Sequence, residues 1–236
     1  MNRETLKTYK NIFDQSTIKI IWDLITQKKI EGIESPIKIG KEANVFSALT
    51  KYNERIALKA YRVNAVDFFQ MSKYLSMDPK YKPMKRRIQI VFLWAKREFI
   101  NLKKAYESGI SVPRPISVKG NVLLMDFIGA KFPEHPMNAP LLKNSCDDPT
   151  CLYEKLREDM RKLYQKAKLV HGDLSEFNIL NNNGTPMIID LSHSISTDSP
   201  AAEELLKRDV EKIVKFFNRK GLKLNVEEVI RYVKGK

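Results

Sequence analysis

The 236-residue chain is long enough for one two-lobed domain or two small ones, and its 43% hydrophobic and 30% charged residues are typical of a soluble globular protein. No apolar run approaches the roughly 18 residues of a membrane span, and no hydrophobic signal core follows Met1, so a cytoplasmic protein without a membrane partner is expected. The formal net charge of +14 favours a polyanionic partner such as RNA or a ribonucleoprotein, with a solubilising surface as the alternative.

The first part of the chain predicts a helix followed by three strands. Ser16 is the expected cap of the helix, because apolar residues follow it at helical spacing. Strands are expected over residues 37–39, 45–49 and 55–61. Side chains alternate along the last strand, which puts Lys59 on the opposite face from its immediate neighbours.

The middle of the chain predicts a helix and a hairpin. Residues 64–90 are expected to be partly helical, because prolines interrupt them. A helix should follow over residues 92–106 and stop at Gly109. Residues 116–119 and 122–127 are expected to pair around a Gly-Asn turn.

A proline-rich connection after Ile128 marks the expected lobe boundary. It gives a nucleotide-binding N-lobe over residues 1–128 and a catalytic C-lobe over residues 129–236. In the second half, helices are expected to open at Asp148-Pro149, Ser199-Pro200 and Asn225.

The most informative segment is residues 171–178, which read HGDLSEFN and place Asp173 five residues before Asn178. An aliphatic run then leads to Asp190, twelve residues after Asn178. Phosphoryl transfer needs one carboxylate near the incoming hydroxyl, and further oxygen ligands that hold magnesium on the phosphates. The spacing fits this chemistry and is similar to the catalytic and metal-binding motifs of protein kinases, with a polar surface turn as the alternative.

Two segments upstream lie in the order found in protein kinases. Residues 40–45 fall between two expected strands, where a loop that covers phosphates belongs; Gly40, Lys41 and Val45 are candidate nucleotide contacts. The following strand carries Ala57 and Lys59 on one face, so that Ala57 would cover the adenine and Lys59 would reach the α- and β-phosphates. An ordinary glycine turn and an exposed strand lysine are the alternatives.

Two more candidate elements complete the nucleotide site. Glu98, on the flank of its helix, is expected to form an ion pair with Lys59 rather than remain a solvated glutamate. The expected hairpin ends in a segment similar to a kinase hinge, with Met125 in the gatekeeper position. Backbone groups of Asp126 and Ile128 would then bind the adenine edge.

Together, residues 40–45, 171–178 and 188–192 resemble the RIO family of atypical serine/threonine protein kinases, over nearly the whole chain. The closer similarity is to the first branch of that family, which lacks an N-terminal winged helix, in an archaeal-type form. The resemblance implies an α+β, two-lobed protein-kinase-like fold. Its N-lobe would hold an antiparallel sheet with helices, and its C-lobe would be reduced and helical.

The resemblance also implies roles for the candidate residues. Lys59 would bind ATP, Asp173 would be the catalytic aspartate, and Asn178 and Asp190 would hold Mg²⁺ or Mn²⁺. Asp190 would also become transiently phosphorylated in an ATPase cycle. Autophosphorylation and a partner in the small ribosomal subunit precursor or its RNA are implied as well.

The sequence departs from ordinary kinases at two positions of the catalytic segment. Ser175 stands where a lysine usually contacts the transferring phosphate, so Lys41 is a candidate for that charge. Gly172 replaces the arginine that would grip an activation-loop phosphate. A small-molecule phosphotransferase of the same fold and a nucleotide-gated RNA-binding module are the competing interpretations.

Two further expectations concern residues 64–90. Autophosphorylation is predicted within residues 70–80, where Ser72 and Ser76 are the candidate acceptors. Five basic residues within eight positions are expected to contact ribosomal RNA, because like charges gain most by meeting a polyanion. These residues are Lys80, Lys82, Lys85, Arg86 and Arg87.

Overall fold

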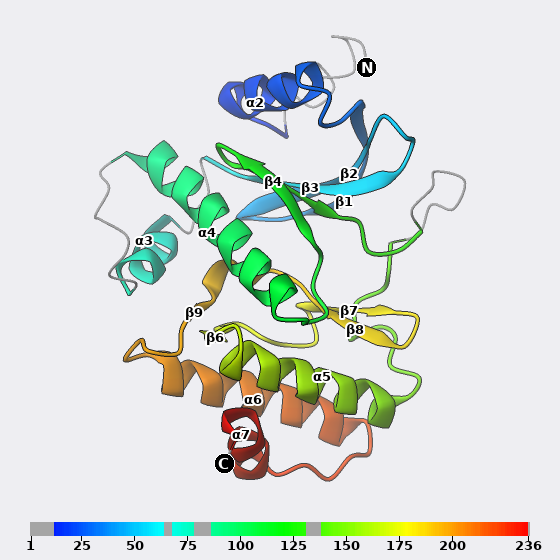
Figure 1. Cartoon of the computed structure of the whole chain (residues 1–236), viewed down its shortest axis with the longest axis vertical. Helices are drawn as coiled ribbons and strands as arrows, with labels where there is room; N and C mark the ends of the chain where they lie inside the picture. The colour runs from blue at the N-terminus through cyan, green and yellow to red at the C-terminus, as the bar shows by residue number, and fades with distance from the viewer. Residues whose placement is uncertain (1–11, 64–67, 78–85, 131–137, 236) are drawn as a thin grey trace. The chain divides into compact units, whose positions relative to one another are not determined.

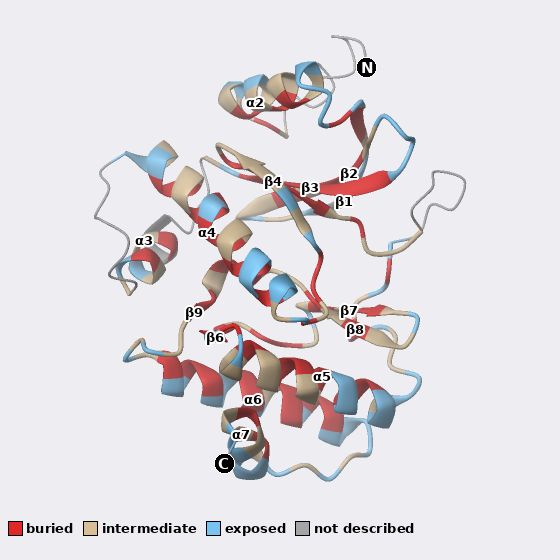
Figure 2. Ribbon diagram, viewed as in Figure 1, coloured by how far each residue is buried: buried red, intermediate tan, exposed pale blue. Residues whose placement is uncertain are grey.

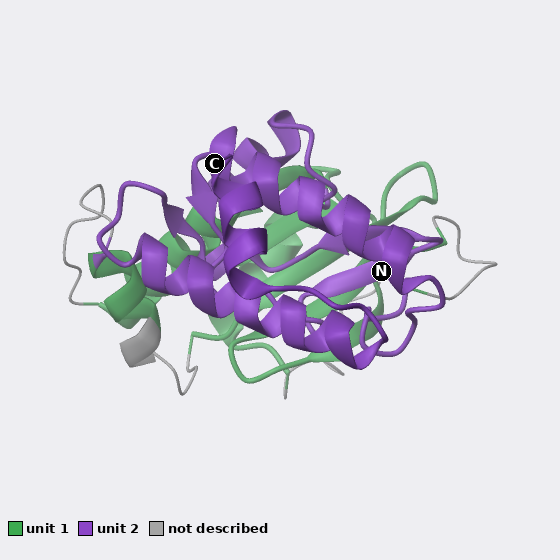
Figure 3. Cartoon of the chain, turned by 90° about the horizontal axis from the view of Figure 1, so that it is seen from below, with its two compact units in different colours: residues 1–76, 81–99, 114–138 green, residues 77–80, 100–113, 139–236 purple. Residues whose placement is uncertain are grey.

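The computed structural model of the chain describes residues 12–63, 68–77, 86–130 and 138–235. They fall into two structural units (Figure 3). Unit 1 comprises residues 1–76, 81–99 and 114–138, and unit 2 comprises residues 77–80, 100–113 and 139–236.

Unit 1 is built on a five-stranded antiparallel sheet in the order β1-β2-β3-β5-β4 (Figure 1). The three expected strands and the expected hairpin are all present, and the first strand begins five residues earlier than its apolar pattern suggested. The strands are β1 (Gly32–Ile39), β2 (Ala43–Leu49), β3 (Arg55–Tyr61), β4 (Pro115–Lys119) and β5 (Val122–Asp126).

Asp14 caps the first helix, α2 (Gln15–Thr26), so the prediction that Ser16 caps it is wrong. The Asp14 carboxylate accepts hydrogen bonds from the backbone N–H and the hydroxyl of Thr17, at 2.9 and 2.8 Å. The Ser16 hydroxyl itself donates to Asp14. A carboxylate is the stronger acceptor for the positive end of a helix, so the cap falls two residues before the predicted position.

Side chains on the two faces of β3 belong to two separate apolar clusters. Leu58 and its same-face neighbours pack with α2 residues, including the fully buried Ile21. Tyr61 packs on the other side with Trp94 of α4 (Arg87–Glu107) and with Met71 of α3 (Phe68–Ser76). Burial on both faces explains why every residue of β3 is buried.

Three helices form the frame of unit 2: α5 (Pro149–Gln165), α6 (Ala202–Arg219) and α7 (Val226–Lys234). Figure 2 shows that α5 and α6 bury one side and expose the other. The expected caps Asp148 and Asn225 are confirmed, since each side chain accepts a backbone N–H of the following turn. Ser199 does not open α6: it lies in a preceding turn, and the helix begins after Ala201 without a side-chain cap.

Unit 2 also contains short strands that the sequence analysis did not predict. They form two antiparallel pairs, β6 with β9 and β7 with β8, and a 3₁₀ turn at Leu191–His193 precedes β9. Their bounds are β6 (Leu169–Val170), β7 (Ile179–Asn182), β8 (Thr185–Ile188) and β9 (Ile195–Ser196). Among the helices of the described ranges, none is both long and apolar enough to cross a membrane.

Candidate active site

The β7–β8 hairpin brings Asn178 and Asp190 together, although twelve residues separate them. Its two-residue turn, Asn183-Gly184, has φ values of 51° and 78°, the left-handed conformation that tight hairpin turns require. Beyond the last strand pair, the N–H of Ile189 donates to the carbonyl of Asn178 at 3.0 Å. The hairpin therefore places the two expected metal ligands at its open end.

Asp190 adopts a backbone conformation that non-glycine residues rarely take. Its φ of 63° and ψ of 64° lie in the left-handed region, which aspartate tolerates better than most side chains. The Ser192 hydroxyl donates to Asp190 Oδ1 at 2.7 Å and helps to fix the carboxylate. Such conformations are retained where the surrounding structure enforces them, and they cluster at functional sites.

Both carboxylate oxygens of Asp173 are held by neighbouring side chains. Asn178 Nδ2 donates to the Asp173 carbonyl at 2.8 Å and to Asp173 Oδ2 at 3.1 Å. Lys212 Nζ, from α6, contacts Asp173 Oδ1 at 2.7 Å. The structure therefore unites Asp173 with Asn178 as predicted, and it adds Lys212, which no local pattern in the sequence indicated.

Asp209 of α6 anchors the backbone of the segment that carries Asp173. Its two carboxylate oxygens accept the N–H groups of Gly172 and Leu174, each at 2.8 Å. The side chain is almost fully buried, and burial raises the pKa of Asp209 from its ordinary 3.8 to about 6. The two N–H donors and the positive charge of Lys212 oppose that rise in pKa.

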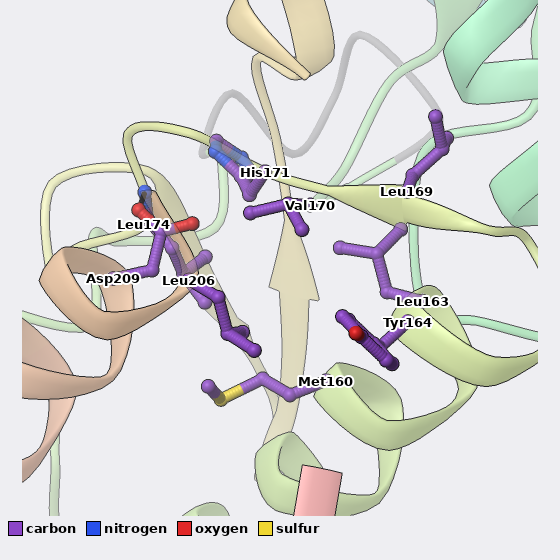
Figure 4. A pocket seen from close by; sticks show the side chains of 9 residues that line it. All are labelled: Met160, Leu163, Tyr164, Leu169, Val170, His171, Leu174, Leu206 and Asp209. Carbon is purple, nitrogen blue, oxygen red and sulfur yellow. Dashed lines mark hydrogen bonds between the residues drawn. The ribbon is translucent and has the colours of Figure 1, made fainter. Parts of the chain in front are cut away.

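Asp209 is poorly solvated because mostly apolar side chains surround it, and these side chains line a small pocket. Figure 4 shows His171 and Asp209 at the pocket among mostly apolar side chains of α5, β6 and α6. The lining residues are Met160, Leu163, Tyr164, Leu169, Val170, His171, Leu174, Leu206 and Asp209.

The backbone accounts for glycine at position 172, where an arginine is usual in protein kinases. Gly172 has a φ of 82°, and a Cβ atom there would lie 2.8 Å from the carbonyl oxygen of His193. That carbonyl belongs to the backbone and cannot move like the end of a flexible side chain. A side chain at this position would therefore be strained and would clash with backbone.

The expected ion pair of unit 1 is confirmed. Lys59 Nζ lies 2.9 Å from Glu98 Oε1, and both side chains are buried. The Tyr61 hydroxyl donates to the other carboxylate oxygen of Glu98. Tyr61 was not among the predicted site residues, although its position two residues after Lys59 on one strand face was a usable signal.

The turn between β1 and β2 requires a glycine. The N–H of Gly40 donates to the Ala43 carbonyl at 3.1 Å, and a Cβ on Gly40 would lie 2.8 Å from that oxygen. Lys41 is exposed at the tip of this turn. Val45 on β2 pairs directly with Lys59 on β3, so the expected loop leads into the strand next to the one that carries the lysine.

The expected hinge residues lie at the end of β5. Met125 is buried and pairs with Ala57, so the gatekeeper and adenine-covering candidates are neighbours in the sheet. The N–H of Asp126 donates to the Arg114 carbonyl at 2.9 Å and is not available to a nucleotide. Ile128, two residues further on, is partly exposed.

The residues of unit 2 fit a magnesium ion held jointly with nucleotide phosphates. Within the described ranges, no group of three or more His, Cys, Asp or Glu side chains is arranged to hold a metal alone. Asn178 uses its amide nitrogen to bind Asp173, which leaves its oxygen as the coordinating atom. Carboxylate and amide oxygens are hard ligands that suit magnesium, which usually keeps phosphate and water ligands as well.

Known proteins are similar to this chain over most of its length. A family model described as the RIO domain matches residues 44–229. The chain is 40% identical over 235 residues to the RIO-type serine/threonine-protein kinase Rio1 of Methanocaldococcus jannaschii, which covers 99% of this chain and 79% of that protein. It is 37% identical over 233 residues to the corresponding Rio1 of Haloferax volcanii, with 98% and 79% covered.

A solved structure supports the fold independently. The crystal structure of the Rio2 kinase–ADP/Mg²⁺–phosphoaspartate complex from Chaetomium thermophilum is similar, with a TM-score of 0.70 and 22% sequence identity. The match covers 99% of this chain and 76% of that one. The expected α+β, kinase-like fold is therefore confirmed. Because the RIO domain model also matches most of the chain, the chain belongs to the family of RIO-type serine/threonine kinases.

Proposed function

We propose that the protein is a cytoplasmic, ATP- and magnesium-dependent kinase and ATPase that autophosphorylates and acts in maturation of the small ribosomal subunit. The observation that carries this proposal is the convergence of Asp173, Asn178 and Asp190 at the open end of one hairpin. All three residues are partly exposed. Stability alone does not require two carboxylates and an amide to gather where solvent or a ligand reaches them.

In the proposed reaction, Asp173 orients the attacking hydroxyl or water and accepts its proton. Asn178 and Asp190 hold magnesium, which when bound neutralises charge on the phosphates. Lys59 binds the α- and β-phosphates, and Glu98 keeps the lysine side chain in place.

Two kinds of acceptor are proposed. The first is a serine hydroxyl of this chain within residues 70–80, where Ser72 and Ser76 lie on α3. The second is the carboxylate of Asp190, which would form a bond to the γ-phosphorus while the bond to the β,γ-bridging oxygen breaks and ADP leaves. Water then hydrolyses the acyl phosphate and regenerates the carboxylate, which completes an ATPase cycle.

The proposal of a ribosomal partner rests on the positive charge of the basic cluster at residues 80–87. Arg86 and Arg87 are exposed at the start of α4. The other members of the basic cluster, Lys80, Lys82 and Lys85, lie outside the described residues. RNA is the polyanion that such a cluster would meet in a ribosomal particle.

Mass spectrometry after incubation with labelled ATP and magnesium, with and without small ribosomal subunits, tests the proposal. We expect hydroxylamine-sensitive label on Asp190 and acid-stable label within residues 70–80. The acid-stable label should disappear in Asp173→Ala, whereas the label on Asp190 should persist there, because a carboxylate attacks without losing a proton and only the later hydrolysis needs an activated water. Both labels should behave as in the wild type in Asp198→Ala, which removes an exposed aspartate outside the site.

The failure of wild-type protein to release ADP or acquire label would refute the kinase and ATPase assignment. Efficient transfer to an added small molecule, without label on the chain, would favour the competing small-molecule phosphotransferase.

A further inference from the structure

The candidate catalytic segment lacks the lysine that ordinary kinases carry two residues after the catalytic aspartate, because Ser175 occupies that position. A positive charge nevertheless lies at the site. Lys212 Nζ is 2.7 Å from Asp173 Oδ1, and both residues belong to unit 2. The lysine comes from α6, 39 residues further along the chain.

We propose that Lys212 is the positioning residue of this site: it orients the Asp173 carboxylate and supplies the positive charge that the catalytic segment itself lacks. This inference rests on the proposed phosphoryl-transfer function, which it deepens. It also replaces Lys41, the candidate that the sequence suggested for that charge, by a residue in direct contact with the catalytic aspartate.

The contact differs from an ordinary surface ion pair in how it is built. Exposed pairs usually contribute about 0–1 kcal/mol to stability, and the Lys212 and Asp173 side chains are 38% and 47% exposed. Here, however, the carboxylate is held from two directions, with Oδ1 on Lys212 and Oδ2 on Asn178. Two contacts on different oxygens fix the plane of the carboxylate, which one contact does not.

The position of Lys212 is itself fixed by the fold. Asp209 lies three residues earlier on α6, one turn away on the same side of the helix. It binds the N–H groups of Gly172 and Leu174, the two residues that flank Asp173. One helix therefore holds the backbone of the segment through Asp209 and the side chain of its aspartate through Lys212.

A lysine has three N–H donors, and Asp173 takes one of them in this structure. The Lys212 side chain is partly exposed, so its other donors can meet an anion brought next to Asp173. A positive charge beside the aspartate stabilises negative charge that develops on a transferring phosphoryl group. Because that charge grows in the transition state, Lys212 should affect the rate more than the binding of ATP.

The decisive experiment compares four variants of the full chain by magnesium-dependent ADP release, nucleotide binding and thermal unfolding. Lys212→Met removes the charge, Lys212→Gln keeps a hydrogen-bond donor without charge, and Lys212→Arg restores the charge. Lys215→Met is the matched control, because Lys215 is an exposed lysine nearly one turn further along α6. It makes no ion pair within the described part of the chain.

We expect Lys212→Met and Lys212→Gln to lower kcat roughly tenfold to a hundredfold, because they remove the positive charge but leave Asp173 and its contact with Asn178 in place. KM for ATP and the unfolding temperature should stay close to those of the wild type. Lys212→Arg should recover most of kcat, and Lys215→Met should behave like the wild type.

A kcat within twofold of wild type in both Lys212→Met and Lys212→Gln would overturn the inference and leave the proposed function standing. So would a loss that Lys212→Arg does not restore, or a loss that merely follows unfolding. If the wild-type protein shows no magnesium-dependent turnover, the proposed function falls, and this inference falls with it.

Discussion

Replacing the buried anchor by its neutral isostere, Asp209→Asn, should remove the loss of stability that the wild type undergoes as pH rises through about 6, and it should impair activity. In the folded chain the pKa of Asp209 is raised to about 6, mainly by burial, whereas an unfolded aspartate keeps a pKa of 3.8. The folded state therefore holds a proton between these values that the unfolded state releases. The stability that comes from this proton is complete below about pH 4 and is lost as pH rises through about 6.

The size of the effect follows from the two pKa values. Each pKa unit corresponds to about 1.4 kcal/mol, so ionisation of Asp209 costs the wild type roughly 3 kcal/mol between about pH 4 and 7. Asparagine has nearly the shape of the protonated aspartate and does not titrate. Relative to the wild type, the unfolding free energy of the variant should thus rise by roughly 3 kcal/mol between about pH 4 and 7. The lost acceptor for one N–H group subtracts about 1–3 kcal/mol at every pH.

Activity should fall in the variant. The carboxylate accepts two N–H groups, from Gly172 and Leu174, whereas an amide offers only one acceptor oxygen and turns its NH₂ toward the other donor. The segment that carries Asp173 then loses one of its anchors, and we expect kcat to fall at least tenfold.

Urea unfolding of both proteins in steps from about pH 4 to 8 measures the stability difference, and ADP release measures the activity. Asp198→Asn, at an exposed aspartate, is the control and should leave both unchanged. A stability difference between Asp209→Asn and wild type that does not vary across this pH range would refute the reasoning, because it would show that Asp209 does not titrate differently in the folded state.

Three further predictions concern the site and its partner. Asp173→Ala should lower ATP turnover roughly 10²–10⁴-fold and leave ATP binding nearly intact, and a wild-type rate in this variant would refute the catalytic role of Asp173. Asn178→Ala should also weaken the magnesium-dependent binding of the nucleotide. Gly172→Ala should cost roughly 1–3 kcal/mol of stability and most activity. Its control is Gly184→Ala, which has a similar positive φ of 78° but no atom within 4 Å of the added Cβ; equal losses would show that the contact with His193 is irrelevant. Changing Lys85, Arg86 and Arg87 to glutamate should weaken binding to small ribosomal subunits and make that binding less dependent on salt. The slope of log binding constant against log salt concentration should flatten by roughly 0.7–0.9 for each RNA phosphate that the protein no longer binds. An unchanged slope would show that these residues form only a solvated surface.

Much of unit 1 and several residue contacts of the candidate site could be predicted from the sequence alone. The alternation of β3, the Gly-Asn hairpin and the acidic or amide caps are local signals, because each depends on residues a few positions apart. The pairing of Lys59 with Glu98 was also predictable, since motif order supplied the long-range information that periodicity lacks.

The structure corrects or adds three other features, all of them local. The cap at Asp14 was decided by competition between two acceptors, and the short strands of unit 2 are too brief to leave a periodic signal. The turn at Asn183-Gly184 has a local hairpin signal in the sequence, although no hairpin was predicted there.

The roles of Lys212 and Asp209 could come only from the folded structure. In the sequence they are two charged residues of an amphipathic helix, where most charges face solvent. Packing of α6 beneath the segment at 171–174 buries Asp209 against two backbone N–H groups and sets Lys212 on the Asp173 carboxylate. A helix fixes which of its residues share a side, but only its packing partners decide what that side contacts.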